Sequence, residues 1–404
     1  MSDSTKRPRD VVLVGRGIQP SHVRQTNQRA ILSVISLQPG ISNAELARVT
    51  DLAPQTVSAV LTDLEQLNLV TRGEVLRGRR GQPATPLYMN PVGALSIGAE
   101  IGWRHIEVCL VGIGTQVLSR VRRTYDYPDA ATIFTDLASI IAELTSSLSP
   151  SERNRLVGMG LAAPGDLGGT TSLLPPPPGQ EQLWAKIDIA NAAAAATGLE
   201  VSLFNDGHAA CWAQRVAHPA PRPMSFVFLV LDTFVGGGIV AENRLWEGPN
   251  GASANLGAML ITDRDGHMRY VHEIASLWAL EKRLQPAGFS LDAVLGRGPV
   301  APVLQALLET WIADAADALA QALINTTRVM EFELAVIESA LPPSITAEIV
   351  AVTAKRLERF PNLVHNARVP LAPGQLGRSG AAQGAALLRM HRRFFSRELV
   401  HMDV

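Results

Sequence analysis

The chain has 404 residues, of which 47% are hydrophobic and 18% are charged, and its formal net charge is −1. This composition is typical of a globular protein long enough for two or three domains, and it excludes a polyelectrolyte that binds nucleic acid with its whole surface. The two cysteines, Cys109 and Cys211, exclude a disulfide framework and a four-cysteine zinc site, and they fit a reducing compartment.

The sequence shows no sign of a membrane segment. No apolar run reaches the roughly 18 residues that a spanning helix needs. The first thirty residues also lack the apolar run of about 7–15 residues that a signal peptide requires. We therefore expect a soluble, cytoplasmic protein without membrane contact.

Charge is unevenly distributed along the chain. Residues 1–90 hold eleven Lys/Arg and seven Asp/Glu, a local charge of +4, whereas the remaining 314 residues carry −5. The junction, GRRGQPATP, has the composition of an exposed loop. This change predicts a basic N-terminal domain at residues 20–90 and a near-neutral body at residues 91–404.

The basic domain carries the signals of three short helices. An apolar stripe from about residue 27 predicts the first helix, which Pro39-Gly40 ends. Ser42 and Glu45 form the S-x-x-E pattern of a capping box, which opens the second helix. Pro54 suits the first turn of the third helix, because its missing N–H is not needed there.

The third helix is predicted to present small polar side chains outward, and a basic hairpin follows it. Such side chains approach base edges and phosphates without steric conflict, and arginines on a glycine-flexible wing suit the phosphates or a narrow minor groove. The alternative is a small helical bundle with a solvated charged loop. We favour a winged helix-turn-helix that binds double-stranded DNA. Its expected DNA-binding residues are Gln55, Thr56, Ser58, Thr62, Arg77, Arg79 and Arg80.

From residue 95 onward, strand and helix signals alternate, which predicts α/β layers around a buried sheet. The expected strands lie in LSIGAEIG, HIEVCLVGIG, LVGMGLAAPG and EVSLFND, and at residues 226–231 and 334–338. The expected helices span residues 130–148, 190–197, 302–330 and 381–397.

One glycine-rich stretch, VLDTFVGGGIV at residues 230–240, follows an expected strand. Glycine-rich turns after a strand are a common way to hold a phosphate. We expect Gly236, Gly237 and Gly238 to let two strands turn closely at the floor of a cleft.

The order of these motifs resembles the ROK family of repressors, uncharacterised open reading frames and sugar kinases, over about residues 20–395. In the body, GLAAPGDL resembles the family's G-x-P-G loop, FNDGHAA its N-D-A-N segment and VLDTFVGGGIV its second phosphate loop. LWEGPNGASANLGAM resembles the E-x-G-H segment, and LGRSGAAQGAALL the C-terminal helix. The resemblance implies a two-lobed, actin-like body of the ribonuclease-H type. It also implies either ATP-dependent sugar phosphorylation or a sugar pocket that controls DNA affinity.

The resemblance also implies a ligand site. The family's general base falls on Asp206, although that carboxylate could instead cap the next helix. The E-x-G-H pair has become Asn255 and Ala258, so only the first can still bond a hydroxyl. A further sugar-binding glutamate aligns with either His272 or Glu273, and that register stays open. The expected effector-binding residues are Gly165, Asn205, Asp206, Asn255, His272 and Glu273.

The residues that would hold ATP are replaced. The family's D-x-G-G-T-K loop reads Glu100-Ile101-Gly102-Trp103-Arg104-His105, which puts a large ring where the backbone should approach phosphate. In the second loop, Asp232 and Phe234 stand where the family has glycines, and Glu338 and Ser339 replace glycines on the adenosine side. Asp232 adds negative charge where a triphosphate would lie. We therefore expect no catalytic residue, no cofactor and no enzyme activity.

The family's zinc cluster is also replaced. The matching segment, ANLGAMLITDRDGHMRYVHEIAS, contains no cysteine and is shorter. His267 and His272 remain, but two histidines without thiolates make a poor structural site. We expect no bound metal.

These observations favour a sequence-specific transcriptional regulator, most simply a repressor, whose degenerate kinase-like body senses a sugar-like ligand. Two-fold operators favour a homodimer or homotetramer. Two alternatives remain: an ATP-dependent sugar kinase with an appended regulatory domain, and a regulator that needs no ligand.

Overall fold

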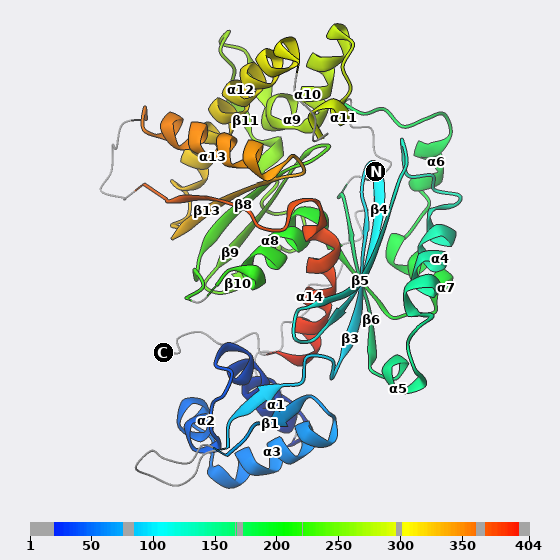
Figure 1. The fold of residues 1–404 in the computed structure, drawn as a ribbon, viewed down its shortest axis with the longest axis vertical. Helices are drawn as coiled ribbons and strands as arrows, with labels where there is room; N and C mark the ends of the chain where they lie inside the picture. The colour runs from blue at the N-terminus through cyan, green and yellow to red at the C-terminus, as the bar shows by residue number, and fades with distance from the viewer. Residues whose placement is uncertain are drawn as a thin grey trace, which may run out of the picture. The chain divides into compact units, whose positions relative to one another are not determined.

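The computed structural model describes residues 20–75, 85–165, 167, 173–219, 221–295, 301–360 and 368–395, with the side chains from residue 22 on (Figure 1). The chain divides into two compact units. The first runs to Tyr88 and includes residues 394–396, and the second holds the rest. Within the described ranges, no helix is long and apolar enough to cross a membrane.

The described residues of the first unit form three helices and a two-stranded sheet, as the sequence predicts. Ser42 and Glu45 form the expected capping box, and Pro54 opens the third helix. Ile31, Leu46 and Leu61, one from each helix, are completely buried and form the centre of its core. The elements are α1 (Pro20–Leu37), α2 (Asn43–Thr50), α3 (Pro54–Gln66), β1 (Val70–Arg72) and β2 (Leu87–Met89).

The second unit is built on two five-stranded sheets, each with a parallel and an antiparallel part (Figure 1). In the first sheet the order is β5-β4-β3-β6-β7: Val117–Thr124, His105–Gly112, Leu95–Ile101, Leu156–Ala163 and Val201–Asn205. In the second it is β10-β9-β8-β13-β14: Arg244–Leu245, Val235–Ala241, Phe226–Leu231, Leu334–Ser339 and Leu371–Pro373. A separate hairpin pairs β11 (Leu260–Thr262) with β12 (Met268–Tyr270).

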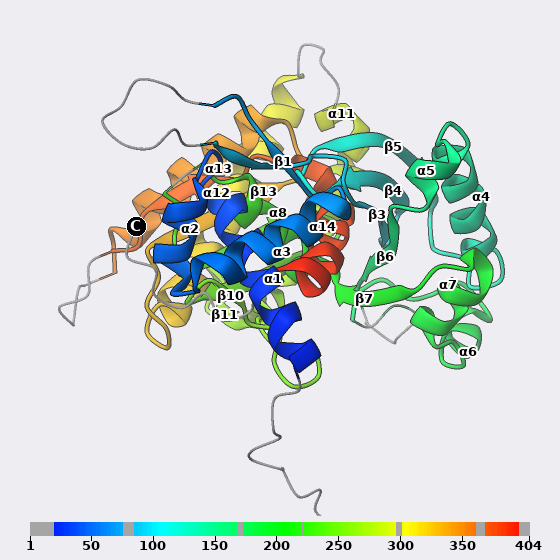
Figure 2. The same ribbon diagram turned by 90° about the horizontal axis from the view of Figure 1, so that it is seen from below.

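Helices cover both sheets and enclose two apolar cores. On the first sheet they are α4 (Ile133–Thr145), α6 (Gln180–Trp184) and α7 (Ile189–Thr197). The short helix α5 (Pro150–Arg153), which buries no residue, connects α4 to β6. On the second they are α9 (Val271–Ala275), α10 (Leu277–Leu284), α11 (Leu291–Leu295), α12 (Pro302–Thr326) and α13 (Pro343–Leu357). Two further helices, α8 (Asp206–Ala217) and α14 (Gly380–Phe394), lie between the sheets (Figure 2). Short 3₁₀ turns occupy Leu256–Ala258, Gln285–Ala287 and Gly377–Ser379.

Helix α14 packs unusually close to its neighbours because glycines remove the intervening side chains. A Cβ atom on Gly98 of β3 would lie 2.0 Å from the carbonyl oxygen of Ala382, and one on Gly160 of β6 would lie 1.9 Å from that of Ala385. A Cβ on Gly384 would lie 1.8 Å from the carbonyl oxygen of Ala209 in α8. Helix α14 therefore contacts both the first sheet and α8, and α8 in turn packs against β9 of the second sheet.

The glycines of residues 236–238 do not form the predicted turn. The turn is made by residues 232–234, with the N–H of Asp232 donating to the Phe234 carbonyl at 3.1 Å, and the glycines lie inside β9. Their role is close packing, since a Cβ on Gly238 would lie 2.3 Å from Cβ of Cys211 in α8. The expectation of a glycine turn was wrong. The glycines are required by the contact between β9 and α8, and the chain reverses without them at residues 232–234.

Candidate functional site

The outer face of α3 carries the polar side chains that the sequence singles out. Gln55, Ser58 and Thr62 are exposed and Thr56 is half-buried, while the opposite face of the helix packs into the core. The Thr62 hydroxyl donates to the Ser58 carbonyl at 3.0 Å, so it is partly engaged within its own helix. Gln55 and Ser58 stand near the N-terminal end, the part of a recognition helix that meets base edges.

Arginines from other elements neutralise the two carboxylates of α3. Arg24 of α1 donates hydrogen bonds to Asp63 at 2.8, 2.6 and 2.5 Å, and these hold the pKa of that carboxyl below its usual range. Arg72 of β1 donates to Glu65 at 2.6 Å. Helix α3 itself contains no Lys or Arg, so these pairs reduce the repulsion that its acids would exert on phosphates.

The strands β1 and β2 form the base of a wing. The N–H of Gly73 donates to the Pro86 carbonyl at 2.8 Å and closes that base. Three residues expected to contact DNA, Arg77, Arg79 and Arg80, lie outside the described residues.

A cleft of about 460 Å³ opens between the two sheets of the second unit. Its walls come from the ends of β3, β7 and β8, from the start of β9 and from the segment that leads into α14. Of the six expected effector-binding residues, five line it: Gly165, Asn205, Asp206, Asn255 and His272.

One half of this cleft is small and polar. Asn205 is the N-cap of α8, because its side-chain oxygen accepts from the N–H of His208 at 3.2 Å. The alternative assigned that cap to Asp206, whose carboxylate instead accepts from the N–H of Gly207 at 2.8 Å. A Cβ on Gly165 would lie 4.0 Å from the Asn205 side-chain nitrogen, so the loop passes close to the amide.

Asp206 lies in an acidic environment. Desolvation by burial, together with the carboxylates of Glu100 and Asp232, raises its pKa to about 6. Asp206 therefore holds a proton more readily than an ordinary aspartate, and it is ionised above about pH 6.

The structure separates the two residues between which the register was open. His272 lines the cleft, and its Nδ1 accepts from the N–H of Val235 at 3.1 Å. Burial lowers the pKa of His272 to about 4, so the ring is neutral at pH 7. Glu273 does not line the cleft, because its carboxylate accepts from the N–H of Tyr270 at 2.8 Å and lies 3.9 Å from Arg269.

The other half of the cleft is filled by aromatic rings. Trp103 and Phe234 meet edge to face, with ring centroids 5.3 Å apart. Phe234 also contacts the ring of His272 at 5.7 Å and that of Trp278 at 6.5 Å. Trp103 and Phe234 stand at the positions that the resemblance assigns to glycines of the phosphate loops.

A buried carboxylate uses the backbone donors beside these rings. Glu338 is 4% exposed and accepts from the N–H groups of Ser339, Leu376 and Gly377 at 2.9, 2.8 and 2.9 Å. A Cβ on Gly374 would lie 2.3 Å from this carboxylate, so the loop wraps tightly around it. Backbone N–H groups that could hold an anionic ligand are thus already occupied by the protein's own anion.

Comparison with protein families identifies both units. The ROK family model matches residues 96–392, which is most of the chain. The chain belongs to the ROK family. A winged helix-turn-helix DNA-binding model matches residues 24–71, the segment that holds the three helices of the first unit.

One curated relative of the chain is a repressor. The xylose repressor of Bacillus subtilis strain 168 is 25% identical over 243 residues, 59% of this chain and 61% of the repressor. This ROK protein therefore spans about 61% of the length of that curated relative.

Solved structures show the same fold. A ROK family transcriptional regulator, described as a homolog of the Escherichia coli Mlc protein, has a TM-score of 0.65 at 18% identity over 91% of this chain and 96% of its own. A ROK family glucokinase from Streptomyces griseus, in complex with glucose and AMPPNP, has a TM-score of 0.56 at 20% identity over 73% and 99%. The predicted architecture, a winged helix-turn-helix followed by a two-lobed ROK body, is confirmed.

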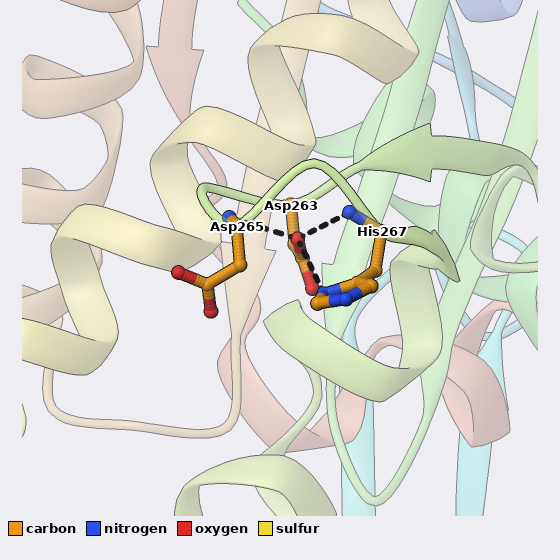
Figure 3. A group of neighbouring side chains, drawn as sticks. All are labelled: Asp263, Asp265 and His267. Carbon is orange, nitrogen blue, oxygen red and sulfur yellow. Dashed lines mark hydrogen bonds and ion pairs between the residues drawn. The ribbon is translucent and has the colours of Figure 1, made fainter.

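The segment that corresponds by sequence resemblance to the family's zinc cluster forms the β11–β12 hairpin. Ligand atoms of Asp263, Asp265 and His267 lie within 4.8 Å of one another. Asp263 points toward His267 and accepts from the N–H groups of Asp265 and His267 at 3.0 and 2.8 Å, whereas the Asp265 carboxylate points away (Figure 3). The carboxylate of Asp263 thus closes the turn of the hairpin through hydrogen bonds to the backbone of two nearby residues.

Two sets of contacts around the cleft escaped the sequence reasoning. Trp278 of α10 contacts the ring of Phe234 without lining the cleft itself, and Leu376 and Gly377 donate to Glu338. Neither has a local signal, because each acts only through contacts with residues far away in the chain. A glutamate in an apolar strand, such as Glu338 in LAVIES, is the one hint, since a buried carboxylate needs donors.

Proposed function

We propose that this ROK protein is a DNA-binding transcriptional repressor whose body binds a small polyhydroxylated effector. The observation that carries the proposal is the exposed polar face of α3, on a winged helix-turn-helix, joined in one chain to a ROK cleft with its phosphate end filled. The similarity to a xylose repressor supports it. Such a protein would act in the cytoplasm.

In this proposal α3 enters the major groove, with Gln55, Thr56, Ser58 and Thr62 near base edges. Arg77, Arg79 and Arg80 would contact phosphates or the minor groove from the wing. A homodimer would present two such helices to half-sites about 34 Å apart. The effector would bind Asn205, Asp206 and Asn255, and would change DNA affinity by preferring one arrangement of the lobes.

DNA binding is tested with the full-length chain. A duplex is first enriched from a random-sequence library and then titrated by fluorescence anisotropy over a series of salt concentrations. Gln55→Ala on α3 should weaken specific binding about tenfold, the value of a good base contact. Gln25→Ala, an equally exposed glutamine on α1, is the control and should leave affinity unchanged. Binding that is equally tight to every duplex, or no binding at all, would reject the proposal.

A sugar kinase is the second candidate, and Asp206 is the observation that favours it. A carboxylate with a pKa near 6 at a cleft suits a general base. Against it stand the rings of Trp103 and Phe234, the charge of Asp232 and the occupied donors around Glu338. We therefore propose that the chain is not an enzyme. Turnover of ATP with any hexose, abolished by Asp206→Asn, would reverse this conclusion.

A regulator without any effector is the third candidate. Thermal shift against a panel of sugars separates it from our proposal, since a ligand at 100 times its Kd adds about 2.7 kcal/mol to stability.

A further inference from the structure

Three carboxylates stand together at the floor of the cleft: Glu100 from β3, Asp206 from the start of α8 and Asp232 from the end of β8. All three line the cavity. The carboxylates of Glu100 and Asp232 both help to raise the pKa of Asp206.

Glu100 shows that the cluster is incomplete. Glu100 is 6% exposed, and its Oε2 has no hydrogen-bond partner among the described residues. Its other oxygen, Oε1, lies 3.3 Å from Nε2 of His105. A buried carboxylate that lacks donors is costly, so a cationic group that enters the cavity beside Glu100 would be stabilised.

The cations around the cluster do not balance it. His105 is the nearest: burial lowers its pKa, but the carboxylates of Glu100 and Asp232 outweigh that effect and the net pKa is raised. Arg122 is held by Glu107 at 2.9 Å, and Arg104 by Glu281 at 2.9 Å. Arg378 also lines the cavity, and its hydrogen bond to the neutral Ala340 carbonyl at 2.9 Å leaves its charge in place. One imidazole and one guanidinium therefore face the three carboxylates, and an excess of negative charge remains.

The geometry favours an organic cation over a metal ion. Among the described residues, the group of acidic and histidine side chains with ligand atoms all within 4.8 Å is the one on the β11–β12 hairpin, and the three floor carboxylates are not part of it. They are spread too widely to converge on one small ion, whereas an ammonium group with three donors can reach separated acceptors.

We propose that the effector of this cleft carries a protonated amine on a polyhydroxylated frame, with the amine against Glu100 and Asp232. Its hydroxyls would reach Asn205 and Asn255, as in the proposed function on which this inference rests. The same floor disfavours a phosphorylated sugar, because its phosphate would lie among three like charges. The chemical class is therefore an amino sugar or aminopolyol.

The test is calorimetric titration of the full-length chain with matched probes: glucosamine, mannosamine and galactosamine, each beside its parent hexose, its N-acetyl form and its 6-phosphate. Free amine and N-acetyl forms share the ring and differ in charge. At least one free amine should bind about tenfold or more tightly than all its matched forms, the ratio expected of a hydrogen bond to a charged group. Equal or tighter binding of the parent, N-acetyl or phosphorylated form would overturn the inference, as would no binding of any amine.

Asp232→Asn locates the amine. The Asp232 carboxylate accepts from the N–H of Thr233 at 2.7 Å, a bond that the asparagine oxygen preserves, so the fold should be retained. We expect about tenfold weaker amine binding and unchanged binding of the parent hexose. Asp265→Asn, on the exposed hairpin, is the control for a lost carboxylate. Unchanged amine affinity in Asp232→Asn, or displacement of the amine by Mg²⁺ alone, would contradict this placement.

The DNA titration, run on the same preparation, keeps the two proposals apart. Specific DNA binding with no preference for an amine rejects only this inference. An amine preference without specific DNA binding rejects only the repressor function.

Discussion

The two halves of the cleft differ in whether side chains fill them. In the open half, Asn205, Asp206 and Asn255 present polar groups to a cavity, and the backbone at Gly165 stays close to them. In the closed half, side chains occupy the space and the donors, through the rings of the aromatic group and the carboxylate of Glu338. In the second sheet, the pairings of β8 with β13 and β9 continue without a register shift.

This contrast separates two reasons for a glycine. Gly237 and Gly238 remain although the nucleotide half is filled, because the 254–256 segment and α8 pack where their Cβ atoms would be. The positions now held by Trp103 and Phe234 face the cleft, where a large side chain meets open space. Glycines required by packing persist, and glycines required only by a ligand can be replaced.

Gly238→Ala tests this separation most severely. A Cβ at Gly238 would lie 2.3 Å from Cβ of Cys211, and α8 must move to admit it. We expect a loss of about 3 kcal/mol or more of folding free energy, at the upper end for overpacked cores. Urea unfolding of the full-length chain measures it.

Gly236→Ala is the matched control in the same strand. Its Cβ would meet only the tip of the Val230 side chain, at 2.9 Å, which can shift. We expect a loss of about 1 kcal/mol. If both substitutions proved equally mild, the packing explanation for these glycines would be wrong.

The neutral state of His272 predicts how stability depends on pH. Its pKa falls from 6.5 in the unfolded chain to about 4 in the fold. Between these values the unfolded state binds the extra proton, so acidification from pH 7 toward pH 4 should remove up to about 3 kcal/mol of stability. Asp206 acts in the opposite direction, because its raised pKa lets the folded state take up the proton below about pH 6.

Comparison with His272→Asn isolates the histidine. Asparagine offers an oxygen to the N–H of Val235 but does not titrate. The variant should therefore lose stability less steeply between pH 6.5 and 4, by a slope of up to about 1.4 kcal/mol per pH unit. Equal slopes in urea unfolding of the two proteins over this range would show that His272 is not held neutral.

Phe234→Ala tests whether the size of the aromatic ring alone keeps ATP out of the closed half of the cleft. The ring contacts Trp103, His272 and Trp278 and is half-buried, so its removal should cost about 2 kcal/mol, less than for a fully buried phenylalanine. We expect no gain of ATP binding by calorimetry, because Asp232 and Glu338 remain. Phe134→Ala, another half-buried ring packed on a tryptophan at 6.1 Å, controls for the lost packing. ATP binding restored in Phe234→Ala alone would show that sterics suffice.

The sequence predicted those features that depend on neighbouring residues. The capping box at Ser42, proline at the start of α3 and the apolar runs of β3, β4, β6 and β8 are local signals, and each element formed where it was expected. Strand β5 and helix α13 were missed. The arginine-rich sequence of β5, VLSRVRRT, suits a half-exposed edge strand and resembles a charged loop.

The cleft was predictable only where a motif keeps its residue type. Asn205, Asp206 and Asn255 could be named from their order in the chain, and they do line one cavity. The choice between His272 and Glu273 could not be made, because adjacent residues of a helix point in different directions and the sequence does not fix the helix's rotation. The donors to Glu338 were hidden because they lie 38 and 39 residues further along the chain.

Substitutions of Asn205 should give the smallest change in stability. They also test the open half of the cleft directly, because the oxygen and the nitrogen of this side chain have different roles. The oxygen caps α8, and the nitrogen lies beside Gly165 at the cavity. Asn205→Ala should cost about 1 kcal/mol of stability, the usual value of a lost N-cap. Asn205→Ser keeps a capping oxygen and should cost only a few tenths of that, and urea unfolding of both variants measures the difference.

Both variants remove the amide nitrogen, so both should weaken binding of the tightest hexosamine in the matched panel, by about threefold to tenfold for one neutral hydrogen bond. Stability would then follow the cap while affinity follows the amide, which a merely structural role for Asn205 cannot produce. Wild-type affinity in Asn205→Ser would confine this residue to holding the helix, and the hydroxyl contacts of the open half would rest on Asn255 and Asp206.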